Sequence, residues 1–128
     1  MLVEDVLRTF LLASLLSVGL AGTAFADASV AGDWRADLGE GVAINMNVTP
    51  DGHWSSETLQ NNKVVRQMRG DYRQTRQGND NGTLVFRPTQ SSKGEAQVET
   101  DQYQLSENGS TMRLTAGGDT MVFERHQH

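Results

Sequence analysis

The sequence predicts an all-β protein, a small antiparallel meander of about eight strands that closes or nearly closes into a barrel. Apolar and polar residues alternate along several segments, and the stretch 42–49 alternates without a break, as a strand with one buried face does. Turn signals recur every ~8–12 residues, which is the spacing of a meander. No stretch after Asp27 has the 3.6-residue apolar period of a helix. Closure removes exposed strand edges, which favours a barrel over an open sheet.

The first half of the predicted barrel contains strands that begin and end at clear turn signals. The first strand starts near Gly32, and the second spans 42–49. A Pro-Asp-Gly turn at 50–52 follows, because proline presets φ and glycine accepts a positive φ. The segment 53–60 is the third strand, and the Asn-Asn pair at 61–62 is suited to a tight hairpin.

The second half begins with a long strand over 64–75, which we expect to bend at Gly70. The Gly-Asn-Asp-Asn-Gly segment at 78–82 must be a loop. The remaining expected strands are 83–87, stopped by Pro88, then 96–105, 111–115 and 120–125.

The N-terminal segment has the organisation of a secretory signal peptide. An apolar run follows Arg8, and Ala24-Phe25-Ala26 is the small-x-small pattern that signal peptidase cleaves. The run is shorter than the ~20 apolar residues of a membrane-spanning helix. We therefore expect a periplasmic or secreted protein without a membrane anchor. The expected divisions are a signal peptide (1–26), a barrel domain (27–125) and a flexible tail (126–128).

Composition restricts the function classes. The chain has no cysteine, which excludes disulfides, thiol catalysis and thiolate metal sites. Its net charge of −5 argues against nucleic acid or an anionic membrane as a partner. His53, His126 and His128 are the one candidate metal set, but ordering a tail costs entropy, so we expect no metal site. No serine has a nucleophile-elbow context, so we expect no catalytic residues and no cofactor.

Basic residues concentrate on one expected strand: Lys63, Arg66, Arg69, Arg73 and Arg76. Positions of like parity share a face of a strand, so Arg69 and Arg73 lie together and Arg66 lies on the opposite face. The residues form either a patch for an anionic ligand or a solvated strand paired with acidic residues. We favour the solvated strand, with Glu57, Glu99 and Asp101 as the partners.

The first and the last predicted strands carry a family resemblance. Gly32-Asp33-Trp34 opens the first strand, and Arg125 ends the last. This resembles the lipocalin and broader calycin pattern, which implies that Trp34 and Arg125 have a structural role, with the guanidinium across the indole closing the barrel base. The sequence departs from that pattern because it is short, lacks the disulfides and C-terminal helix, and lacks the Thr-Asp-Tyr motif. A Gly-x-Trp opening also occurs in small periplasmic protease inhibitors.

Two functions fit a barrel of this kind. The first is a carrier or sensor of a small apolar or amphipathic molecule, which predicts an interior cavity of ~300 Å³ or more. Its candidate ligand-binding residues are Met46, Trp54, Met68, Phe86 and Met112. The second is a protein-binding module, such as an inhibitor of an exported protease or an envelope-assembly partner, which predicts a filled interior and an exposed apolar patch. A homodimer formed by pairing of edge strands is a third interpretation.

Overall fold

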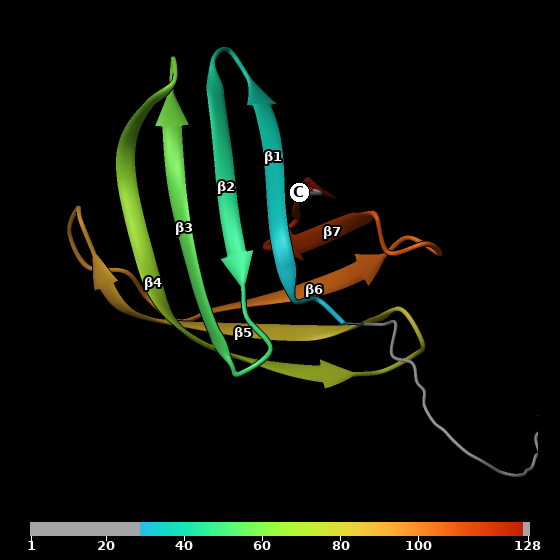
Figure 1. The fold of residues 1–128 in the computed structure, drawn as a ribbon. Coiled ribbons are helices and arrows are strands. Elements are labelled where there is room, and N and C mark those ends of the chain that lie inside the picture. The colour runs from blue at the N-terminus through green and yellow to red at the C-terminus, as the bar shows by residue number, and fades with distance from the viewer. Residues whose placement is uncertain (1–28, 127–128) are drawn as a thin grey trace, which may run out of the picture.

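Eight antiparallel strands, each paired with the next along the chain, close into a barrel in the computed structural model, which describes residues 29–126 (Figure 1). The predicted all-β fold and the closed barrel are confirmed. The expected signal peptide (1–26) and the last two residues lie outside the described part of the chain. The strands are β1 (Gly32–Gly39), β2 (Val42–Val48), β3 (His53–Gln60), β4 (Lys63–Arg76), β5 (Asn81–Ser91), β6 (Glu99–Leu105), β7 (Thr111–Ala116) and β8 (Asp119–Arg125).

The barrel has two layers whose strands cross (Figure 1). The antiparallel strands β1 to β3 lie side by side in one layer, while β5, β6 and β7 lie across them in the other. The long strand β4 belongs to both layers because it bends at Gly70, where its register with β5 shifts. A Cβ atom at Gly70 would lie 2.0 Å from the carbonyl oxygen of Arg87, so only glycine fits at this position. The structure thus bends β4 where the sequence predicted.

Alternate residues of each strand face the barrel interior. The register pairs Trp34 with Met46 and Ala36 with Ile44, which places both pairs on the inward face of β1 and β2. The same alternation continues around the barrel and gives one continuous core. The buried residues of this core are Val30, Trp34, Ala36, Met46, Val48, Trp54, Leu84, Phe86, Tyr103, Leu105, Met112, Leu114 and Phe123.

Trp34 and Arg125 close one end of the barrel. The Trp34 side chain is only 1% exposed, and its indole N–H donates a hydrogen bond to the carbonyl oxygen of Val30 at 2.9 Å. The guanidinium carbon of Arg125 lies 4.2 Å from the centre of the indole ring. The same guanidinium donates hydrogen bonds to the carbonyl oxygens of Ala31 at 2.6 Å and Gly109 at 2.9 Å. This is the geometry that the lipocalin resemblance implies.

Three strand boundaries differ from the sequence prediction by two residues or more. β5 begins at Asn81, so the last two residues of the expected 78–82 loop belong to the strand, and Gly82 pairs with Arg76. β5 continues through Pro88 to Ser91, because Pro88 pairs with Gly70 beside the bulge, where the ladder is already irregular and a missing N–H is tolerated. β6 begins at Glu99 and not at residue 96. Val98 and Tyr103 have opposite parity, so one regular strand does not bury both, and Val98 is 58% exposed.

Replacing the buried indole tests the closed end of the barrel. Trp34→Ala should lower the free energy of unfolding by ~3–5 kcal/mol, because it leaves a large cavity and removes the surface on which Arg125 packs. Urea titration followed by circular dichroism measures the change. Leu38→Ala is the control, since Leu38 lies on the same strand but is 46% exposed. A loss below ~1 kcal/mol for Trp34→Ala would contradict the closure described here.

Candidate functional site

A cavity of about 610 Å³ occupies the barrel interior. It lies toward the end opposite Trp34 and Arg125, because several of its lining residues are near the turns that join β1 to β2, β3 to β4 and β7 to β8. Inward positions of β2 to β8 and the segment 95–98 form its wall. The apolar strand residues in this wall are Ile44, Met46, Trp54, Met68, Phe86, Pro88, Leu114, Met121 and Phe123.

Short inward side chains leave this part of the barrel open. Ser56 on β3 lies between Met46 and Met68 in the register, and Thr58 occupies the next inward position. A large apolar side chain at either position would extend into the same space. The cavity is larger than the ~300 Å³ expected of a ligand-binding barrel, so the alternative of a filled interior does not describe this structure.

Four of the five candidate ligand-binding residues line this cavity: Met46, Trp54, Met68 and Phe86. The rings of Trp54 and Phe86 meet edge to face with their centres 5.2 Å apart, which is a favoured aromatic arrangement. Met112 is not among the lining residues. It is fully buried and pairs with Leu105 and Phe123, so it packs into the core beyond the cavity.

Polar groups of the cavity were not anticipated from the sequence. Asp101 was expected to pair with the basic strand at the surface, and this is wrong because its side chain faces inward and is 1% exposed. Its Oδ1 atom has no hydrogen-bond partner among the described residues, and neither does Nε of Arg66. The alternation along β6 indicated the inward position of Asp101, since it shares its parity with Tyr103 and Leu105. All three residues are buried. Glu99, two residues earlier, also lines the cavity.

Asp101 presents a neutral carboxyl group to the cavity at neutral pH. Burial raises the pKa of Asp101 to about 8. The neighbouring Glu99 adds to this rise in pKa, because its carboxylate accepts a hydrogen bond from the protonated form of Asp101 and repels the ionised form. The two carboxyl groups therefore act as a pair, which we call the β6 acid pair.

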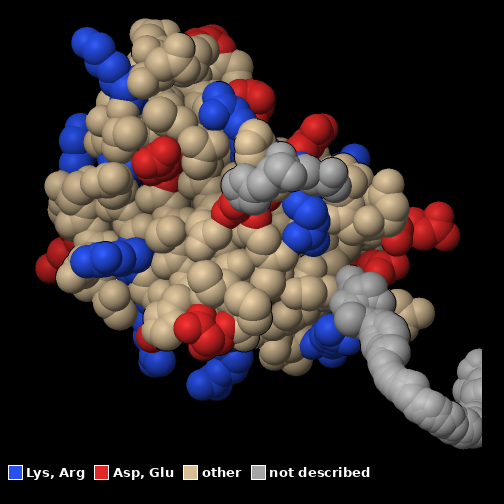
Figure 2. Space-filling model, viewed as in Figure 1, with Lys and Arg blue, Asp and Glu red and all other residues tan. Residues whose placement is uncertain are grey.

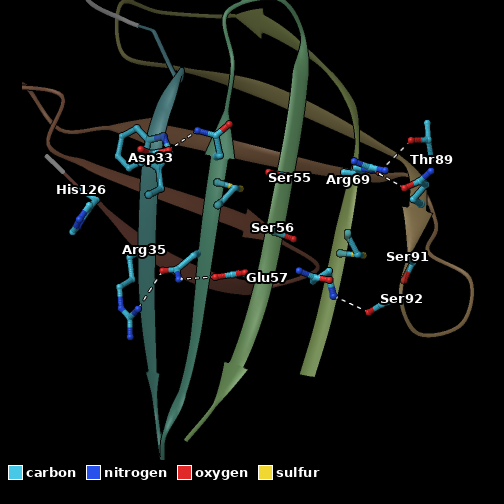
Figure 3. Close-up of a pocket in the computed structure, with 17 residues that line it drawn as sticks. Asp33, Arg35, Ser55, Ser56, Glu57, Arg69, Thr89, Ser91, Ser92 and His126 are labelled. Atoms are coloured by element: carbon cyan, nitrogen blue, oxygen red, sulfur yellow. Dashed lines mark hydrogen bonds between the residues drawn. The ribbon is translucent and has the colours of Figure 1, made fainter. Parts of the chain in front are cut away.

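A larger hollow, of about 1160 Å³, lies over β1 to β4 and the end of β5 (Figure 3). Outward polar side chains make up much of its lining, and it shares Met46, Ser56 and Met68 with the interior cavity. Its polar side chains bond to one another. Arg35 donates to the amide oxygen of Asn45 at 3.2 Å, and the Asn45 amide donates to Glu57 at 3.3 Å. Arg69 donates to the amide oxygen of Gln90 at 2.6 Å. These groups are already paired, whereas the interior cavity holds polar atoms without partners.

The surface gives no sign of a single charged docking site on the face that is drawn. Figure 2 shows acidic and basic side chains interspersed over this face. Among the basic residues of β4, Arg69 borders the outer hollow while Arg66 lines the interior cavity. The basic residues of this strand therefore do not form one patch.

No protein-family model, curated protein or solved structure matches the chain. Within residues 29–126, no helix has the length and apolar character needed to cross a membrane. The barrel and its interior cavity are therefore the features from which a function is inferred.

The buried carboxyl group predicts a pH-dependent stability difference. Between about pH 4 and pH 8 the unfolded chain releases the Asp101 proton while the native protein retains it, so this group lowers the free energy of unfolding as the pH rises. Asp101→Asn removes this dependence. The stability of the variant relative to the unmodified protein should therefore increase with pH, by as much as about 1.4 kcal/mol per pH unit.

Denaturant titrations of both proteins at several pH values measure this difference. Glu107→Gln, an exposed carboxyl-to-amide change in the β6–β7 turn, is the control and should show no such trend. A stability difference for Asp101→Asn that stays constant from pH 5 to pH 8 would contradict the raised pKa.

Proposed function

We propose that this protein is an exported binding protein of lipocalin-like type that holds a small apolar or amphipathic molecule inside its barrel. The observation that carries the proposal is the interior cavity of about 610 Å³, which is lined by residues of seven strands and is open to solvent on one side. Pockets of ~300–1,000 Å³ with mainly apolar walls and a few polar groups are typical of small-molecule sites. The cavity combines three aromatic side chains and three methionines with a small set of polar groups.

The lipocalin-like and exported character belong to the same proposal. The eight-stranded closed barrel and the Arg125 guanidinium across the Trp34 indole support the first part. The signal-peptide pattern of residues 1–26 supports export.

A protein-binding module is less well supported. It would use an exposed apolar patch on the barrel surface. The large apolar side chains that are exposed come from four separate segments: Leu38 on β1, Val64 on β4, Val98 before β6 and Val122 on β8. Most of the apolar side chains concentrate in the interior.

A pair of adjacent serines on β3 tests where a ligand binds. Ser56 lines both the interior cavity and the outer hollow, whereas Ser55 lines only the outer hollow, so a phenylalanine at Ser55 obstructs the outer hollow and spares the interior. Ser56→Phe should weaken binding of the neutral fluorescent probe N-phenyl-1-naphthylamine by at least about tenfold. Ser55→Phe should leave binding unchanged. Probe fluorescence measures affinity, and circular dichroism confirms that both variants are folded.

Two results would contradict the proposal. Loss of probe binding in Ser55→Phe would move the site to the outer hollow, which that residue lines and the interior cavity does not share. Absence of probe binding to the unmodified protein would show that the cavity does not take an apolar molecule.

A further inference from the structure

We infer that the ligand of the interior cavity is an amphipathic amine, whose ammonium group binds the β6 acid pair while its apolar part lies among the methionines and aromatic rings of the wall. This inference rests on the proposed function and specifies the chemical class of its ligand. It is carried by the position of Asp101 and Glu99 in the cavity and by the charges that surround them.

The first observation is a buried oxygen without a partner. Asp101 is one of the residues that line the cavity, and its Oδ1 atom is buried beneath the cavity wall with no hydrogen-bond partner among residues 29–126. A buried acceptor left unpaired costs free energy, which a donor on a bound molecule would recover. An ammonium group supplies three donors and a positive charge, and charge-assisted hydrogen bonds are about twice as strong as neutral ones.

The second observation is the arrangement of the pair along β6. Asp101 and Glu99 are two residues apart and therefore on the same face of the strand. Glu99 is exposed near the beginning of β6, while Asp101 lies further along and is buried. A cationic group entering from solvent would therefore meet Glu99 first and then Asp101.

The third observation is the balance of charge in the cavity wall. Among the described residues it contains three carboxyl groups and one guanidinium: Glu95, Glu99, Asp101 and Arg66. The register neighbour of Asp101 on β5 is the uncharged Leu84, and Leu114, the residue of β7 in the wall, is also uncharged and pairs with Tyr103. Arg66 and Asp101 form no ion pair with each other within the described chain. The acidic excess favours a cationic ligand over an anionic one.

Binding of an amine should be linked to a proton. The raised pKa of Asp101 means that the empty cavity holds a protonated carboxyl at pH 7. An ammonium ion pairs best with the ionised carboxylate, so the complex forms with release of the Asp101 proton to solvent. The affinity should therefore rise with pH by up to about tenfold per unit until about pH 8.

Three probes of equal chain length separate the ligand classes: 1-decylamine, 1-decanol and decanoate. Isothermal titration calorimetry at pH 7 in two buffers of different ionisation enthalpy gives affinity and proton release together. We expect 1-decylamine to bind at least about tenfold more tightly than the other two, with release of close to one proton. Asp101→Asn should abolish the preference for the amine while retaining affinity for 1-decanol, and Glu107→Gln should change neither.

Each contrary result would overturn a different part of the proposal. Equal binding of the three probes, or tightest binding of decanoate lost in Arg66→Met, would overturn the amine inference and leave the proposed function standing. Binding of 1-decylamine without proton release would remove Asp101 as its partner, and this measurement needs no variant. Failure of all three probes to bind would overturn the proposed function as well.

Discussion

Closure of the barrel between its first and last strands depends on Arg125. β1 and β8 share only two register pairs, whereas β1 and β2 share seven. Arg125 compensates for this short seam, since it packs across the Trp34 indole and donates hydrogen bonds to carbonyl oxygens before β1 and in the β6–β7 turn. One side chain thus joins three segments that are far apart in the sequence. This contact reinforces the backbone pairing of β1 with β8, which leaves the sheet without open edges.

The interior cavity follows from how side-chain volume is distributed along the barrel axis. The large side chain of Trp34 is packed at the closed end and is almost fully buried. Toward the other end, Ser56 and Thr58 occupy inward positions of β3, and their short side chains leave space. The bend of β4 at Gly70 brings the second layer across this space and encloses it. The barrel is thus closed at the end where Trp34 and Arg125 lie and less completely filled toward the other end, which is where the cavity lies.

Period-two alternation made the strands and most of the inward residues predictable, because a strand with one buried face shows its pattern locally. Depth along the barrel axis is not a local property, which explains why Met112 was grouped with Met46 although only Met46 lines the cavity. Asp101 was missed because a carboxylate is usually solvated, even though its parity placed it inside. The extension of β5 past Pro88 depends on a bulge in the partner strand, which no pattern within β5 reveals.

The central claim, a ligand-binding space inside the barrel, is tested most directly by the methyl signals of the methionines. Met46, Met68 and Met121 line the cavity, whereas Met112 is buried in the core outside it and serves as a control within the same molecule. NMR spectra of protein labelled with ¹³C at the methionine methyl groups would be recorded while 1-decanol is added. If the ligand binds inside the barrel, we expect saturable chemical-shift changes for the three lining methionines and little change for Met112. Unchanged signals for all four, or shifts of Met112 as large as the others, would contradict it.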